Sequence, residues 1–336
     1  MTGGGLTDVH THFFPDALLA AVDGRREPPC ICTENGTRFL SFGPGPSRQY
    51  PLTPAMSDVE AKLAEMERAG ITHSVLSVNM PGVDGLGDDG PAAARAVNDD
   101  MHRTAAAAPD RLSWLGVVAL ERPDSVAAEV RRCASSGACG VMIGSNVNGR
   151  PLSLDGDQAL FDAAHEAGLA IMVHPSFPLS SESVADYRLT SILGFLFDTT
   201  TATLRLVLGG MFDRYPDLRF VVSHVGSLLP FIVGRIDYLS TERPGGMGEL
   251  TVPPSEHLRR LYVDGVCLWP PALRLGTEFF GADHVMFGSD APYWPMDRAV
   301  QTLTAVGLSG RDSLALAYAT AAHVFVGGGR PPAGAL

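Results

Sequence analysis

The sequence lacks the features that direct a protein into a membrane or onto a nucleic acid. Its 336 residues contain no basic leader and no apolar run near the roughly 20 residues that a membrane span needs. Its 37 acidic and 25 basic residues give a net charge of −12, which repels phosphate backbones and anionic lipid. We therefore expect no nucleic-acid partner, no membrane and no secretory signal.

Cysteine and lysine are also scarce. The five cysteines are odd in number, and Cys30 and Cys32 are too close together for an ordinary disulfide. No second closely spaced pair completes a zinc site, so we expect five reduced thiols in a cytoplasmic protein. Lys62 is the one lysine among the 25 basic residues, and the others are all arginines.

Eight short apolar runs recur along the chain, and each is followed by a helix-like pattern. They lack polar alternation, which is typical of parallel strands buried on both faces. This order predicts an α/β protein, a (β/α)₈ barrel of the TIM type forming a single domain over residues 1–336. A doubly wound open sheet is the alternative. The eight runs are Leu6–His12, Ile71–Val78, Leu112–Val118, Gly140–Ile143, Leu169–His174, Arg219–His224, Leu261–Val263 and His284–Phe287.

Two insertions interrupt the alternation. Residues 21–54 are rich in Gly, Pro and Arg and too irregular to form a domain. Residues 176–200 form a shorter insertion after the fifth predicted strand. Both follow the carboxyl end of a strand, so in a barrel they lie at the C-terminal mouth. We expect the first to act as a lid or an active-site wall.

Ligand-type side chains end four of the predicted strands. His10 and His12 are two residues apart, so both rings project from the same side of the first strand. His174 ends the fifth strand, His224 ends the sixth, and Asp290 follows the eighth. A lone histidine is more often structural, but five such residues at the active-site end of a barrel favour a site. Three imidazoles and a carboxylate suit a zinc-like divalent ion.

The motifs around these residues resemble the amidohydrolase superfamily. Within it they resemble the branch that contains aminocarboxymuconate-semialdehyde decarboxylase and related aromatic decarboxylases, and the resemblance runs from residue 8 to about residue 295. It implies that His10, His12, His174 and Asp290 are metal ligands, and that His224 activates or orients the metal-bound water. The motifs are Asp8–Pro15, His174-Pro175, Ser223–Gly226, Phe231–Asp237 and Phe287–Asp290.

The scarcity of lysine limits the number of metal ions. Two-metal members of this superfamily usually bridge their ions with a carbamylated lysine at the end of the fourth strand. Here that strand reads Gly140-Val-Met-Ile-Gly144, and Lys62 lies far away on the first predicted helix. A lysine-bridged pair is excluded, so we expect one divalent ion: zinc in the first place, with manganese as the alternative.

The resemblance also implies two arginines that bind a substrate carboxylate. Arg48 stands where the semialdehyde decarboxylase keeps one of them. Arg235 corresponds to a second, which in that family reaches into the neighbouring subunit's site, so we expect a homodimer. A guanidinium grips a carboxylate through two hydrogen bonds, which a lysine does not. The alternatives are a solvated loop charge for Arg48 and a helix-surface ion pair for Arg235.

Aromatic residues near the strand ends are candidates for the walls of a substrate pocket. Phe177 follows the His-Pro pair, where the semialdehyde decarboxylase has a different sequence. Tyr187 and Arg188 lie in the loop beyond it, and Tyr293 and Trp294 follow the metal-binding aspartate. Phe177 and Trp294 could equally be ordinary packing residues.

Three functions remain open at this stage. The favoured one is a metal-dependent, non-oxidative decarboxylase of an aromatic or unsaturated carboxylic acid, with the metal stabilising charge as carbon dioxide leaves. His224 with water, or Asp290, would supply the proton to carbon. The second is a hydrolase whose metal-activated water attacks an amide, lactone or carbon–carbon bond, with Asp290 and His224 moving protons. The third is a metal-bearing binding protein without turnover.

Overall fold

Eight parallel strands form the centre of the computed structural model, which describes residues 5–42, 49–79, 82–242, 250–308 and 310–325. Each strand pairs with its neighbours in the order β1-β5-β6-β7-β10-β11-β12-β13, and nearly every residue in them is buried. The strands are β1 (Thr7–His12), β5 (His73–Ser77), β6 (Leu112–Gly116), β7 (Gly140–Gly144), β10 (Ala170–His174), β11 (Phe220–Val222), β12 (Tyr262–Asp264) and β13 (Val285–Met286).

Hydrogen bonds join the first strand to the segment at the end of the last. The Val9 N–H donates to the Phe287 carbonyl at 3.0 Å, and the His12 N–H donates to the Ala291 carbonyl at 2.7 Å. The sheet therefore curls into a nearly closed barrel. The prediction of a (β/α)₈ barrel is confirmed, and the open-sheet alternative is wrong.

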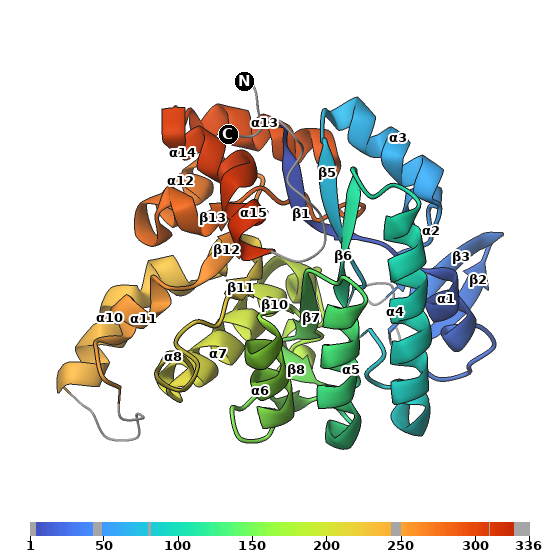
Figure 1. Cartoon of the computed structure of the whole chain (residues 1–336), viewed down its shortest axis with the longest axis horizontal. Helices are drawn as coiled ribbons and strands as arrows, with labels where there is room; N and C mark the ends of the chain where they lie inside the picture. Colours follow the sequence, from blue (N-terminus) through green and yellow to red (C-terminus); the bar gives the residue numbers. More distant parts are fainter. Residues whose placement is uncertain (1–4, 43–48, 80–81, 243–249, 309, 326–336) are drawn as a thin grey trace.

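Helices surround the strands (Figure 1). Gly70 and Gly168 end α3 and α6 in the left-handed conformation, with φ of 73° and 62°, which glycine adopts without a steric penalty. The longer helices are α3 (Val59–Ala69), α4 (Gly90–Ala106), α5 (Pro123–Ser135), α6 (Gln158–Ala167), α7 (Phe195–Leu208), α10 (Leu229–Glu242), α12 (Pro270–Phe280) and α13 (Met296–Val306). The shorter ones are α1 (Asp16–Val22), α2 (Pro54–Ser57), α8 (Met211–Arg214), α9 (Ser223–Gly226), α11 (Pro254–Leu258), α14 (Gly310–Leu314) and α15 (Thr320–Val324).

One helical segment is longer and more apolar than the sequence analysis allowed. Thr190–Leu208 combines a π-helical start, η4 (Thr190–Gly194), with α7, and is long and apolar enough by length and composition to cross a membrane. The expectation that no run comes near that length is therefore wrong. The segment is weak support for a span, because a core helix passes the same test of length and composition. Its apolar content has a local cause, since α7 buries Ala202, Leu206 and Val207 in the fold.

The first insertion contains regular structure that the sequence analysis did not predict. β2 (Cys30–Glu34), β3 (Thr37–Ser41) and β4 (Gln49–Pro51) form a three-stranded antiparallel sheet. Asn35 and Gly36 connect β2 to β3, with φ of 50° and 79°. An Asn-Gly pair with two positive φ angles is the strongest short-range signal for a hairpin. The description of this segment as irregular is wrong, because that signal outweighs the Gly and Pro content around it.

Candidate metal centre and active-site cavity

Four side chains meet at the C-terminal end of the barrel. His10 and His12 come from β1, His174 ends β10, and Asp290 follows β13. One ligand atom from each residue lies within 4.8 Å of the others, and all four residues are buried. The predicted ligand set therefore forms a metal site, and its nitrogen and oxygen donors are those that zinc and manganese bind.

Hydrogen bonds at the outer edge of the rings orient the two histidines of β1. His10 donates from Nδ1 to Oδ2 of Asp264 at 2.7 Å. The Ser77 hydroxyl donates to the Thr11 carbonyl at 3.1 Å, so its oxygen is left to accept from Nδ1 of His12 at 3.3 Å. With the proton on Nδ1, the neutral ring carries its lone pair on Nε2.

The same arrangement holds for the third histidine. Nδ1 of His174 donates to the Pro175 carbonyl at 3.0 Å, which leaves a lone pair on its Nε2 as well. The Nε2 atoms of His10 and His12 are 3.2 Å apart, and Nε2 of His12 is 3.0 Å from Oδ1 of Asp290. The Nε2 lone pairs of the three histidines and the Asp290 carboxylate converge on one point, and a cation at that point would stabilise them. The donor set therefore fits a divalent metal ion.

Burial and charge set the protonation states of these groups. Burial lowers the pKa of His12 to about 4 and that of His174 well below its usual value. Burial also acts to lower the pKa of His10, but Asp264 and Asp290 outweigh it and raise this pKa to about 9. For Asp290, burial is outweighed by the neighbouring imidazoles, so its pKa lies well below the usual range. In the metal-free site at neutral pH, His12 and His174 are therefore neutral rings with one proton each, and His10 carries a second ring proton and a positive charge.

The loop after β13 depends on close contacts with β1. A Cβ atom at Gly288 would lie 3.0 Å from Cβ of His10, so a side chain does not fit there. Ser289 donates its backbone N–H and its hydroxyl to the buried carboxylate of Asp8, at 3.0 and 2.5 Å. Asp290 has a φ of 58°, and its N–H donates to the His10 carbonyl at 2.7 Å. These contacts aim the Asp290 carboxylate at the histidines.

Asp264, at the end of β12, is a functional residue that the sequence analysis missed. It is fully buried. Oδ2 faces the His10 ring, and Oδ1 accepts the backbone N–H groups of His224 and Val266 at 2.8 and 3.0 Å. The rule that polar residues at strand ends face the site would have found it. The predicted seventh strand, 261–263, stopped one residue short of it.

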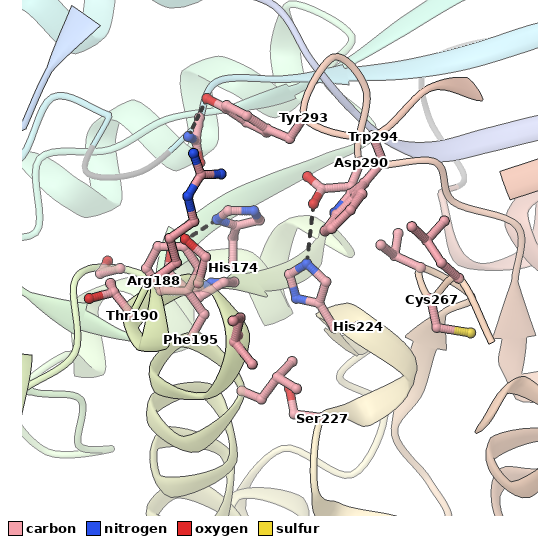
Figure 2. Close-up of a pocket in the computed structure, with 18 of the residues that line it drawn as sticks. His174, Arg188, Thr190, Phe195, His224, Ser227, Cys267, Asp290, Tyr293 and Trp294 are labelled. Carbon is pink, nitrogen blue, oxygen red and sulfur yellow. Dashed lines mark hydrogen bonds and ion pairs between the residues drawn. The ribbon is translucent and has the colours of Figure 1, made fainter. Parts of the chain in front are cut away.

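His224 lies in a turn, and the prediction that it ends the sixth strand is wrong. β11 ends at Val222, and His224 and Val225 both adopt left-handed conformations, with φ of 58° and 56°. The backbone turns here because the Asp264 carboxylate accepts the His224 N–H. As a result Nε2 of His224 lies 3.4 Å from Oδ2 of Asp290 (Figure 2). His224 is thus next to the metal cluster without being one of its four members.

A cavity of about 1400 Å³ lies beside the metal cluster and reaches His174, His224 and Asp290. Both insertions contribute to its wall, as do the loops that follow β11, β12 and β13. A mostly apolar cavity with a few convergent polar groups is typical of small-molecule sites. The aromatic side chains that line it are Phe42, Tyr50, Phe177, Phe195, Tyr293 and Trp294, together with the more exposed Tyr187 and Phe231.

The three aromatic residues predicted to bind substrate all line this cavity. The Phe177 ring packs between Phe42 and Phe195, with ring centroids 5.9 and 6.1 Å away. Tyr187 is 85% exposed, and Trp294 is 44% exposed. Their position is the one that the prediction requires, and their part in substrate binding stays a prediction.

The structure bears differently on the two arginines that were predicted to bind a substrate carboxylate. Arg48 lies outside the described residues. Arg235 is exposed on α10 and does not line the cavity of its own chain, although Pro230 and Phe231 at the start of the same helix do. Its contribution to a neighbouring subunit stays a prediction.

Tyr293 lines the cavity as predicted, and its hydrogen-bond partner Asn79 escaped the sequence analysis. The Asn79 amide donates to the Tyr293 hydroxyl at 2.6 Å. The Tyr293 ring lies 5.0 Å from Tyr50 and 5.4 Å from His12. Burial raises the pKa of Tyr293 well above its usual value, so it stays a neutral phenol that can donate a hydrogen bond. Asn79 follows the end of the second barrel strand, where the strand-end rule applies again.

The fold and the site define a (β/α)₈ barrel with a centre of three histidines and one aspartate. The family description "Amidohydrolase" matches residues 7–327, and the chain belongs to this family. The resemblance inferred from the motifs is confirmed. The chain is 28% identical over 240 residues to a 2-amino-3-carboxymuconate-6-semialdehyde decarboxylase of Dictyostelium discoideum, covering 70% of this chain and 67% of the relative.

Solved structures of similar proteins share the whole fold. A 5-carboxyvanillate decarboxylase from Sphingomonas paucimobilis has 31% identity and a TM-score of 0.82, over 96% of this chain and 98% of the other. A 5-carboxyvanillate decarboxylase of Novosphingobium aromaticivorans has 26% identity and a TM-score of 0.81, over 96% of this chain and 97% of the other. That protein was solved as a mutant with bound manganese and 3-methoxy-4-hydroxy-5-nitrobenzoic acid.

Proposed function

We propose that this protein is a metal-dependent, non-oxidative decarboxylase of an aromatic or unsaturated carboxylic acid, which makes it a carboxy-lyase of the amidohydrolase family. One observation carries the proposal: the Asp290–His224 pair stands between a three-histidine metal centre and an aromatic-lined cavity. The decarboxylases that the chain resembles act, by their names, on 5-carboxyvanillate and on an aminocarboxymuconate semialdehyde.

The cavity can hold a flat ring beside the metal centre. Phe177, Tyr293 and Trp294 offer faces and edges for stacking, and the Tyr293 hydroxyl, which accepts from the Asn79 amide, offers its own hydrogen to a ring hydroxyl or a carboxylate. These side chains also displace water from the ring. A divalent ion held by His10, His12, His174 and Asp290 would supply Lewis-acid polarisation of a substrate oxygen.

The proton needed at carbon can come from the Asp290–His224 pair. Loss of carbon dioxide breaks a carbon–carbon bond, and the ring carbon must gain one proton. Oδ2 of Asp290 and Nε2 of His224 are 3.4 Å apart and both border the cavity, so a proton can pass between them and on to the substrate. The left-handed turn at His224 holds its ring in this position.

We further propose that the chain works as a homodimer in a reducing cytoplasm, with one zinc ion per chain and manganese as the alternative. The five cysteines are free, which supports the reducing compartment. Phe231 and Tyr238 on α10 are 83% and 60% exposed, and Arg235 lies between them on the same face. An exposed stripe of aromatic residues and arginine is typical of a protein interface.

In such a dimer each site receives Arg235 from the partner chain. There Arg235 binds the substrate carboxylate together with Arg48, which belongs to the chain that holds the site. α10 begins at the mouth of the cavity, since Pro230 and Phe231 line it. A partner that packs on the exposed face of α10 would therefore lie close to the mouth. An isologous two-fold contact places the partner's α10 symmetrically.

The proposed decarboxylase activity can be tested by measuring the release of carbon dioxide. The zinc- or manganese-loaded enzyme is incubated with a panel of hydroxylated benzoic acids in deuterated water. We expect one carbon dioxide per acid consumed and one deuterium at the carbon that lost the carboxylate, with no reaction after the metal is removed. Turnover of amides or lactones without carbon dioxide would instead make the protein a hydrolase, and tight binding of an acid without any turnover would make it a binding protein.

A further inference from the structure

The loop between η3 (Ser181–Val184) and η4 places one arginine in the wall of the cavity. Among the described residues that line this cavity, Arg188 is the one arginine or lysine, and Glu182 and Asp290 are the acids. Figure 2 shows the Arg188 side chain extending along the cavity toward the side where Tyr293 lies. A permanent cation in a mostly apolar cavity is a binding group for an anion.

The backbone holds Arg188 in place. Tyr187 and Arg188 have φ of 48° and 59°, a left-handed conformation that costs free energy for residues other than glycine. The Arg188 carbonyl accepts the N–H groups of Ser191 and Ile192 at 3.0 and 3.1 Å, at the start of the long helix. The backbone of the loop is therefore attached to the first turn of this helix, and the exposed side chain of Arg188 extends from it into the cavity wall.

The loop is also fastened to the barrel at its other end. Asp198, which is buried on α7, accepts the Leu179 N–H at 3.0 Å and the Asn146 amide at 2.8 Å. The Asn146 amide also donates to the Phe177 carbonyl at 2.8 Å. Fixed anchors on both sides limit the freedom that the loop would lose when a ligand binds.

The guanidinium of Arg188 forms no ion pair with the two acids of the cavity, Glu182 and Asp290, or with any other described residue. No hydrogen bond from a described residue engages its guanidinium either, whereas Arg132 and Arg150 are each paired with acidic side chains. The protein as a whole carries a net charge of −12, which repels an anionic substrate. The Arg188 guanidinium, which no described residue pairs with, offsets this repulsion at the place where the anion has to bind.

We propose that Arg188 is a substrate-binding residue that grips the carboxylate of an aromatic acid from within the same chain, in addition to any arginine supplied by the partner. The planar guanidinium can form two parallel hydrogen bonds with a carboxylate, which fixes the plane of the acid against the aromatic wall. This inference rests on the proposed function for its substrate class. It makes the loop after β10 the element that selects acids over neutral analogues.

Binding of 2-hydroxybenzoate and of its neutral analogue 2-hydroxybenzamide tests this assignment by calorimetry on the metal-loaded enzyme. We expect Arg188→Gln to weaken 2-hydroxybenzoate binding roughly 10- to 100-fold. The same variant should change 2-hydroxybenzamide binding less than about twofold. Arg188→Lys should give an intermediate loss, because it keeps the charge but loses the two-pronged contact.

The matched control is Arg205→Gln, which removes the same charge from an exposed position on α7 outside the cavity. If Arg188→Gln weakens the acid no more than Arg205→Gln does, or weakens acid and amide equally, the assignment is wrong. Because binding is measured directly, the assignment can hold even where the wild-type protein releases no carbon dioxide. Conversely, carbon dioxide release with unchanged KM in Arg188→Gln would overturn the assignment and leave the proposed function standing.

Discussion

The Asp264 carboxylate lies 2.7 Å from Nδ1 of His10, and its second oxygen accepts the backbone N–H of His224 at 2.8 Å. One buried side chain therefore orients a metal ligand and also sets the turn that carries the proposed catalytic histidine. Both effects depend on two acceptor oxygens. An asparagine in this position would keep the shape but replace one acceptor with a donor.

We therefore expect Asp264→Asn to lower metal affinity roughly 10- to 100-fold, as loss of an outer hydrogen-bond partner of a ligand histidine does. Competition with a chelator measures this affinity. The control is Asp283→Asn, an exposed acid on the 3₁₀ turn before β13 and outside the site. Equal metal affinity in the two variants would show that His10 does not need Asp264.

Replacement of His224 separates catalysis from metal binding. His224→Ala should keep its metal and lose turnover by roughly 10²–10⁴-fold, because the imidazole faces Oδ2 of Asp290 outside the ligand cluster. His174→Ala, by contrast, should lose metal and activity together. Elemental analysis should give one ion per wild-type chain. Loss of metal in His224→Ala would make His224 a ligand, and two tightly bound ions per wild-type chain would disprove the single-metal site.

Metal binding should release a proton at neutral pH. The pKa of His10 is raised to about 9 in the metal-free site, whereas burial lowers that of His12 to about 4. At a pH of about 7.5 the His10 ring of the metal-free site therefore carries one proton more than a neutral imidazole, and the ion displaces that proton. Apparent metal affinity should rise with pH up to about 9 and then level off. Calorimetry in two buffers of different ionisation enthalpy counts the protons, and no release near neutral pH would contradict this assignment.

Mixed dimers test whether Arg235 completes the neighbouring site. A chain with Arg235→Ala is paired with a chain with His224→Ala, so one site carries both lesions and the other carries neither. This mixture should regain activity that neither mutant homodimer shows. An active monomer by light scattering, or a mixture without activity, would rule out the shared site.

Replacement of Lys62, which lies away from the cavity, should lower the stability of the fold. Its side chain is fully buried, and Nζ donates to Oγ1 of Thr11 at 3.1 Å and lies 3.5 Å from a Glu65 oxygen. Lys62→Ala removes this bond and leaves a cavity behind β1. We expect the free energy of unfolding to fall by about 2–4 kcal/mol, measured with denaturant. Arg68→Ala on the exposed side of the same helix should change it by less than about 0.5 kcal/mol.

Strand ends could be located from the sequence because parallel strands of a barrel are short and buried on both faces. Their apolar runs are continuous, so the polar residue that ends each run stands out. His10, His12 and His174 were found in this way. Asp264 could have been found by the same rule. It was missed because the predicted strand, 261–263, ended one residue before it.

Amino-acid composition predicted the structure of the loops less well than it predicted the strands. Residues 21–54 are rich in Gly and Pro, which obscured a hairpin whose turn is Asn35-Gly36. The loop at Tyr187 and Arg188 adopts left-handed backbone conformations that neither residue type favours. The Arg188 carbonyl accepts the N–H groups of Ser191 and Ile192 in η4, a contact that exists only in the folded loop, so the sequence alone does not place Arg188 in the cavity wall.

Residue type, order and spacing were enough to predict the barrel, five ligand-type side chains at its C-terminal end and the absence of a lysine that could bridge a second metal, and the family resemblance implied which four of the five are the ligands. These are properties that can be read along the chain without knowing which segments touch. Packing was needed to show that Asp264 links His10 to His224, that Asn79 pairs with Tyr293, and that Arg188 rather than Arg235 lines the cavity of its own chain. Those relationships join residues that are distant in the sequence, or depend on strained turns, and only the folded barrel brings such groups together.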